Sequence, residues 1–352
     1  MNEYVKTAIQ ISKNQRVHPT AVSEFRPAWW LRGPHRQTVW RKLFDGAPLP
    51  SYRRERFETS DGDFVDLDWH DSERPSDERP LVIVLHGLEG SSQSPYVPGL
   101  LREAARRGWD GVALNFRSCS GELNRLPRFY HSGETGDLDE VVSSLIVRWP
   151  GRPIGLVGYS LGGNVLLKWL GERGEKAPDC LRAAVAVSTP FDLAAAAYRV
   201  DHGIHRIYGQ VFLRTLKQKA LMKLQRYPNL LDPKKVVRSQ SFAEFDDCVT
   251  APLHGFTSAQ DYWTRASASP WLEEIRKPTL LLSAIDDPFL PARCLPHDAA
   301  ARSRWLTAEF TPYGGHVGFV EGRWPGAASY WVDRRAMDHL DSSLRTDFKF
   351  KR

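Results

Sequence analysis

Cysteine is scarce in this sequence, and the few that occur are far apart. Among 352 residues there are four: Cys119, Cys180, Cys248 and Cys294. None belongs to a C-x-x-C pair or to a cluster of cysteine and histidine, so we expect no structural metal. Scattered thiols are typical of a reducing compartment, which favours a cytoplasmic location.

The sequence also lacks long hydrophobic runs and blocks of one charge. No apolar segment approaches the length of a membrane span, and residues 1–15 mix charges without the apolar core of a secretory signal. The formal charge is +6, but the 48 lysines and arginines are spread along the chain, so nucleic acid is not an expected partner. Contact with the surface of an anionic membrane, or with an anionic substrate, stays open.

Short apolar runs alternate with helical patterns along most of the chain. The run 81–85, Leu-Val-Ile-Val-Leu, is unbroken, as in a strand buried on both faces. Further strands are expected at 111–116, 154–157, 183–188, 279–284 and 308–311, with helices at 97–107, 137–147, after residue 162 and at 328–344. A hairpin over 53–69, turning at Asp61-Gly62, precedes them. This order predicts an α/β fold with a mostly parallel central sheet and helices on both faces.

The pattern divides the chain into an arm, a core and an insertion. Residues 1–50 hold three tryptophans close together, which predicts an arm packed on the core; a lip of the pocket or a membrane-facing patch is the alternative. Residues 51–190 and 276–352 form the predicted core. Between two core strands, residues 191–275 are largely helical by pattern, which predicts a cap over the site rather than helices that merely extend the fold.

A nucleophile motif lies at the centre of the core. The strand ending at Val157 runs into Gly158-Tyr159-Ser160-Leu161-Gly162, and a helical pattern follows. Strand, G-x-S-x-G and helix are the context of a strained turn that exposes a nucleophilic serine. Because glycine has no Cβ, the two flanking chains can approach closely. Ser160 would then stand at a helix N-terminus, which favours developing negative charge.

A serine hydroxyl needs a base, and the base needs a group that orients it. Active sites in parallel sheets lie beyond the carboxyl ends of the strands. His316 follows the last expected strand, after Gly314-Gly315, and is the candidate base. Asp286 and Asp287 both follow the strand before it. Asp287 begins a D-x-x-x-P loop and is favoured as the acid, with Asp286 as a supporting group or the alternative.

Two backbone amides would bind the oxyanion of an acyl-transfer intermediate. One is the N–H of Leu161, directly after the nucleophile, and the other is the N–H of Leu88 in the loop His86-Gly87-Leu88. His86 is expected to hold that loop by hydrogen bonds. The candidate pocket residues are His86, Tyr130, His131 and Tyr159.

These motifs together resemble the α/β-hydrolase superfamily and, within it, the YheT-type hydrolases (AB-hydrolase family four). The matching stretches are Trp29-Trp30-Leu31 with Gln37-Thr38, His86-Gly87-Leu88-Glu89-Gly90, Asn115-Phe116-Arg117 with Cys119-Ser120-Gly121, Tyr130-His131-Ser132-Gly133, Gly158 to Asn164, Asp286-Asp287-Pro288-Phe289 and Gly314 to Phe319. The resemblance implies the α/β-hydrolase fold and a serine hydrolase with Ser160, Asp287 and His316 as its triad. Ser118 departs from the family, in which glycine is usual at this position.

The expected function is hydrolysis of carboxylic acyl esters, esterase-like or lipase-like, through an acyl-enzyme and without a cofactor. Some similar proteins transfer the acyl group to an alcohol, so an acyltransferase with the same triad is the alternative. A catalytically silent protein that binds a ligand or partner is a third reading, disfavoured because all three triad residues are present. The expected partner is a small-molecule acyl ester; oligomeric state is not encoded in these patterns.

Overall fold

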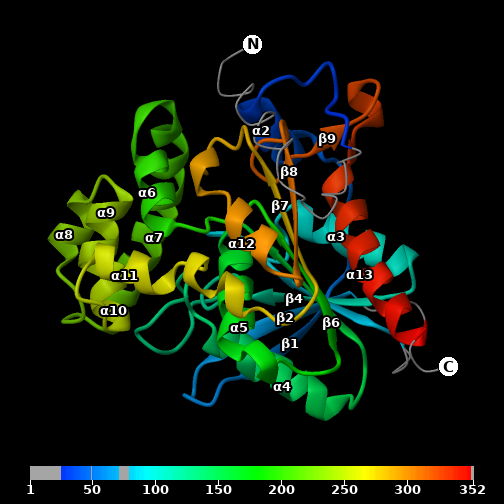
Figure 1. Ribbon diagram of the computed structural model, residues 1–352. Helices are drawn as coiled ribbons and strands as arrows, with labels where there is room; N and C mark the ends of the chain where they lie inside the picture. The colour runs from blue at the N-terminus through cyan, green and yellow to red at the C-terminus, as the bar shows by residue number, and fades with distance from the viewer. Residues whose placement is uncertain (1–24, 49, 71–78, 350–352) are drawn as a thin grey trace.

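An eight-stranded sheet forms the centre of the computed structural model, which describes residues 25–48, 50–70 and 79–349 (Figure 1). The strands are β1 (Arg53–Glu58), β2 (Phe64–His70), β3 (Leu81–Leu85), β4 (Asp110–Asn115), β5 (Ile154–Tyr159), β6 (Leu181–Val187), β7 (Thr279–Ala284) and β8 (Leu306–Thr311). Their order is β1-β2-β4-β3-β5-β6-β7-β8. β1 and β2 are the expected antiparallel hairpin, and every pairing among β3 to β8 is parallel. The predicted fold class is confirmed.

Helices cover both faces of the sheet, and β3 shows why its sequence is an unbroken apolar run. Leu81, Ile83 and Leu85 belong to one apolar cluster, with α4 (Gly136–Arg148) and α5 (Leu161–Arg173). Val82 and Val84 belong to the cluster on the other face, with α3 (Tyr96–Arg106) and α13 (Trp331–Lys349). Successive strand residues point to opposite faces, so a strand covered on both sides needs apolar side chains throughout. Short helices lie between further core elements: η1 (Gly174–Lys176) between α5 and β6, and η5 (Ala292–Cys294) and α12 (His297–Arg302) between β7 and β8.

A group of helices connects β6 to β7 and lies to one side of the sheet (Figure 1). It comprises α6 (Leu193–Asp201), η2 (Gly203–His205), α7 (Arg206–Arg226), α8 (Pro233–Arg238), α9 (Phe242–Phe245), the π-helix η3 (Asp246–Thr250), α10 (Ala251–His254), α11 (Ala259–Ala266) and η4 (Ser269–Glu274). Four of these helices begin at an Asp or Ser whose side chain accepts a backbone N–H: Asp192, Asp232, Ser241 and Ser258. Such caps explain how short helices form here despite the polar sequence.

Residues 25–44 pack against residues 320–333, before and at the start of the closing helix, and here the structure differs from the sequence expectation. Residues 1–24 of the expected arm lie outside the described residues, but the arm contains a helix, α2 (Pro34–Phe44), that the pattern did not predict. Two short strands, β9 (Val320–Glu321) and β10 (Ser329–Tyr330), flank η6 (Pro325–Ala327) and pair with each other. The closing helix, expected from residue 328, therefore begins at Trp331. Two-residue strands are defined by their partners, so local pattern does not reveal them.

The three tryptophans of the arm differ in how they pack. Trp30 and Trp40 pack together, with ring centroids 4.6 Å apart, against a cluster that includes Val320, whereas Trp29 is exposed. Within the described ranges, no helix is both long and apolar enough to cross a membrane.

Candidate active site

The turn between β5 and α5 holds Ser160 in a strained backbone conformation. Ser160 has φ +51° and ψ −118°, a region that residues other than glycine rarely adopt. A Cβ on Gly158 would lie 2.4 Å from the carbonyl oxygen of Gly162, and a Cβ on Gly162 would lie 2.5 Å from that of Leu85. Both contacts are impossible for a larger residue, so the spacing of the motif follows from the close approach of strand and helix.

Three side chains from the ends of three parallel strands form one line of hydrogen bonds. Nε2 of His316 lies 3.0 Å from Oγ of Ser160, and its Nδ1 lies 2.8 Å from Oδ2 of Asp287. The Asp287 side chain is buried, and its Oδ1 accepts the N–H groups of Phe289 at 2.8 Å and Leu290 at 3.3 Å. With both oxygens occupied, the carboxylate is fixed in orientation toward the imidazole.

Asp286 occupies a different place from Asp287. Its Oδ1 accepts the N–H of Gly315 at 2.9 Å, so it braces the loop that carries His316. Burial, the largest cause, raises the pKa of Asp286 to about 6. Of the two aspartates left open by the sequence, Asp287 therefore meets the imidazole and Asp286 meets the loop backbone.

Two hydroxyls that sequence reasoning did not single out also hold this loop. The N–H of His316 donates to Oγ1 of Thr38 at 2.9 Å, and the N–H of Val317 donates to Oγ of Ser188 at 3.0 Å. Thr38 lies on α2, so the N-terminal segment contributes directly to the position of His316. The only sequence signal for Thr38 was its place in a stretch that resembles the family.

In the loop after β3, the backbone N–H of Leu88 lies between two N–H groups that donate hydrogen bonds to tyrosine hydroxyls. Gly87 donates its N–H to the hydroxyl of Tyr96 at 2.9 Å, and Glu89 donates its N–H to that of Tyr130 at 2.7 Å. Within the described part of the chain, the N–H of Leu88 has no acceptor, and the same holds for Leu161 at the start of α5. Both residues line the cavity that contains Ser160.

His86 supports this loop rather than facing the cavity. Its Nε2 accepts the N–H of Phe116 at 3.1 Å, so its Nδ1, 2.8 Å from the carbonyl oxygen of Gly87, carries the proton. Burial lowers the pKa of His86 to about 4, which keeps the ring neutral. Sequence reasoning expected this supporting role.

A side-chain cluster joins the same loop to α7. The hydroxyl of Tyr130 donates to Oε1 of Glu89 at 2.9 Å, and Nζ of Lys219 lies 2.8 Å from that oxygen. The Glu89 backbone has φ +55°, the left-handed region, which needs local support in a residue with a side chain. Lys219 thus connects the helices after β6 to the residue next to Leu88.

An apolar cavity of about 600 Å³ opens around Ser160 and His316. Its walls come from the loop after β3, from α2 and largely from the helices between β6 and β7; they include Leu43, Leu88, Leu193, Val200, Ile207, Val211, Phe212, Phe242, Phe245, Tyr262, Trp263 and Phe289. Tyr130 and His131 line it, as expected. His86 and Tyr159, the other pocket candidates, do not line the cavity. Tyr159 is fully buried and packs on Tyr96, in the apolar cluster between the sheet and α3.

Comparisons with known proteins agree with this fold. A family described as having the alpha/beta hydrolase fold matches residues 80–323. YheT of Escherichia coli (strain K12), an esterase by its provisional name, is 40% identical over 345 residues, covering 95% of this chain and 98% of its own. The chain belongs to the YheT-type α/β-hydrolases.

More distant proteins share the fold of this α/β-hydrolase. Phospholipase ABHD3 of Homo sapiens is 31% identical over 322 residues, covering 90% of this chain and 78% of its own. The solved structure of the esterase Pf2001 from Pyrococcus furiosus superposes with a TM-score of 0.53 at 16% identity, covering 92% of this chain and 99% of its own. Together the curated relatives support hydrolase activity.

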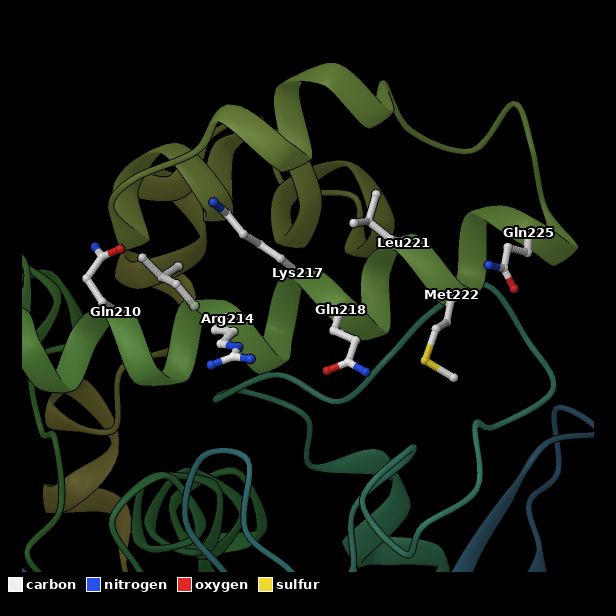
Figure 2. A pocket seen from close by; sticks show the side chains of 8 residues that line it. Gln210, Arg214, Lys217, Gln218, Leu221, Met222 and Gln225 are labelled. Carbon is white, nitrogen blue, oxygen red and sulfur yellow. The ribbon is translucent and has the colours of Figure 1, made fainter.

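A second hollow of the α/β-hydrolase, of about 540 Å³, follows α7 away from this chemistry (Figure 2). Arg214, Lys217, Gln218 and Met222 are among its lining residues, and none of the candidate catalytic side chains is. Among the described residues, no group of three or more histidine, cysteine, aspartate or glutamate side chains is arranged to hold a metal. The arrangement around Ser160 is suited to acyl transfer through a serine nucleophile.

Proposed function

We propose that this chain hydrolyses carboxylic acyl esters, with Ser160 as nucleophile, His316 as general base and acid, and Asp287 as the group that orients His316. The continuous line of hydrogen bonds from Asp287 through His316 to Ser160, at the wall of an apolar cavity, carries the proposal. The short distances suit proton transfer, and the neighbouring amides of Leu88 and Leu161 suit an oxyanion.

Acylation begins when Oγ of Ser160 attacks the ester carbonyl carbon and Nε2 of His316 takes the hydroxyl proton. The carbonyl oxygen becomes an oxyanion, which accepts hydrogen bonds from the N–H groups of Leu88 and Leu161. Collapse of this intermediate breaks the bond to the alcohol oxygen, and the imidazolium returns its proton to the leaving alkoxide. Asp287 stays ionised throughout and stabilises the imidazolium.

Deacylation repeats these steps with water as the nucleophile. Nε2 of His316 takes a proton from water as its oxygen attacks the acyl carbon, and the same two amides hold the second oxyanion. The imidazolium then protonates Oγ of Ser160, which releases the carboxylic acid and restores the free enzyme. No cofactor takes part in either half.

The substrate is inferred from the cavity wall. Aromatic and aliphatic side chains dominate the lining, which favours an ester with an apolar acyl chain. We propose that residues 191–275 act as the cap over the site, since α6, α7, α9 and α11 supply much of that lining. The name of the related phospholipase supports a lipid-like ester.

Labelling with a fluorophosphonate probe tests the mechanism. Wild-type protein should be labelled and should cleave p-nitrophenyl esters, with a preferred chain length between acetate and laurate. Ser160→Ala should lose labelling and at least about 10⁴-fold of turnover, and His316→Ala, which keeps the serine, should be labelled far more slowly. Labelling or turnover that persisted in Ser160→Ala would contradict the proposal. Added glycerol would reveal whether an alcohol competes with water in deacylation.

A further inference from the structure

Exposed apolar side chains gather where the cavity meets the surface. Leu43 and Phe44 on α2, Ile204 in η2, and Ile207 and Val211 on α7 are each between 55% and 67% exposed. Three of them, Leu43, Ile207 and Val211, also line the cavity, so they surround its opening. Large apolar side chains held in water at one place mark an interaction surface.

The two helices that carry these residues are joined at their N-terminal ends. Nδ1 of His35, in the first turn of α2, lies 3.0 Å from the hydroxyl of Tyr208 on α7. The His35 ring also stacks on that of His205, with centroids 5.5 Å apart. At the other end of α2, Leu43 lines the same cavity as Ile207 and Val211, so apolar residues of both helices lie around one opening.

The charge on these helices is of one sign. α2 contains three basic side chains and α7 contains six, and neither helix contains an acidic one. Arg36, Lys42, Arg206 and Arg214 are exposed. On α7, Arg214, Gln218 and Met222 project from one side of the helix (Figure 2), and helical spacing puts Ile207 and Val211 on that same side. Arg41, Lys219 and Lys223 point inward, to Asp333, Glu89 and the carbonyl of Asn124, so the positive charge of this surface comes from the exposed basic side chains.

We propose that this docking face, made of Leu43, Phe44, Ile204, Ile207 and Val211 with the exposed basic residues of α2 and α7, binds the surface of an anionic lipid bilayer. Apolar side chains enter the boundary between headgroups and acyl chains, and the cations bind lipid phosphates. A second copy of this chain fits the face poorly, because it would present the same positive charge. The inference rests on the proposed function, since a bilayer would then supply lipid esters directly at the cavity opening.

Vesicle co-sedimentation tests the proposal, with vesicles of phosphatidylcholine alone and of phosphatidylcholine mixed with phosphatidylglycerol. The protein should bind the mixed vesicles much more strongly, and added salt should weaken that binding. The double variant Phe44→Asp/Ile204→Asp should reduce the partition coefficient about tenfold or more. Val147→Asp is the matched control, because Val147 is 80% exposed on α4, far from α2 in Figure 1, and it should bind as the wild type does.

Two further variants keep the result interpretable. Arg36→Glu/Arg206→Glu should reduce binding through charge alone, which covers the case in which the double aspartate variant fails to fold. Ser160→Ala should bind vesicles as the wild type does, so failure of the catalytic mechanism and failure of membrane binding give different results. Wild-type protein that ignored phosphatidylglycerol, or surface variants that bound as well as Val147→Asp, would overturn the proposal.

Discussion

The sheet core and the helices between β6 and β7 are held together in different ways. In the core, whole strands such as β3 and β5 are buried, and large apolar clusters lie on both faces. The helices between β6 and β7 have smaller apolar clusters, one of which includes Phe129 of the core loop after β4, and they also meet the core loops through polar contacts. The hydroxyl of Tyr262 accepts the N–H of Ser132 at 3.0 Å, and Nζ of Lys223 donates to the carbonyl of Asn124 at 2.6 Å.

This difference separates the part of the molecule that positions the candidate catalytic residues from the part that forms the cavity wall. Ser160, Asp287 and His316 all follow core strands, so their mutual geometry depends on the most buried part of the molecule. Much of the cavity wall comes from the helices between β6 and β7. The polar contacts that hold these helices to the core cost less free energy to break than the packing of the sheet. We therefore expect substitutions in the core to abolish chemistry or folding, and those in the helical region to change rates and substrate range.

After loss of Ser160 itself, the largest effect should come from the paired aspartates. Asp287→Ala removes the partner of the His316 imidazole and should lower kcat by about 10³- to 10⁴-fold. Asp286→Ala removes only a brace of the Gly315 amide and should lower kcat by less than about tenfold. Steady-state kinetics on one soluble ester checks both. Equal losses in the two variants would mean that Asp287 does not act through His316.

A matched pair of leucines compares the stability of the two regions. Leu281 in β7 and Leu213 in α7 are both almost fully buried, and Leu→Ala at such sites costs about 2–5 kcal/mol. Leu281→Ala should lower the free energy of global unfolding, measured by urea denaturation. Leu213→Ala should instead speed hydrogen exchange within residues 193–266 and leave β3 and β5 protected. If both variants lowered protection everywhere equally, the two regions would be one cooperative unit.

Lys219 tests the contact between the regions. Lys219→Met leaves the Glu89 carboxylate without its ammonium partner, beside the amide of Leu88, and should lower kcat about tenfold with a smaller change in KM. Lys219→Arg should restore most of the loss. Lys217→Met, on the same helix with its Nζ on the carbonyl of Val237, is the control.

A boronic acid inhibitor separates positioning from general damage in these variants. It mimics the tetrahedral intermediate, so its affinity should fall in parallel with kcat in Lys219→Met if the oxyanion loop has moved. A stable variant with lower kcat but unchanged inhibitor affinity would place the effect of Lys219 elsewhere.

Sequence reasoning worked best where structure depends on local pattern. The core strands and the G-x-S-x-G turn follow from apolar runs and from glycines that no larger residue can replace. Ser118 is a similar case: its φ of +64° explains why glycine is usual in the family, and its hydroxyl accepts the N–H of Asn124.

Contacts between distant segments could not be predicted in this way. Thr38 and His316 are 278 residues apart, and only the folded chain brings the α2 hydroxyl to the histidine loop. The choice between Asp286 and Asp287 likewise depends on which carboxylate faces His316, a matter of loop geometry. Helix α2 was missed although Pro34 stands at its first position, where proline is common, because the segment was interpreted from its tryptophans alone.

The smallest predicted effect concerns pH and is confined to the helical region and the loop it covers. The rings of His131 and His254 lie 4.5 Å apart, and burial lowers the pKa of both, that of His131 to about 3. Both rings are neutral in the folded chain, so their contribution to stability is complete above the unfolded pKa of about 6.5 and is lost as pH falls toward 3.

Hydrogen exchange corrected for intrinsic pH dependence should therefore show α10 and α11 loosening between pH 7 and pH 4 before the sheet does. His254→Phe, which keeps an aromatic ring and removes one titrating group, should reduce that dependence; a pH response unchanged by the substitution would assign it to other groups.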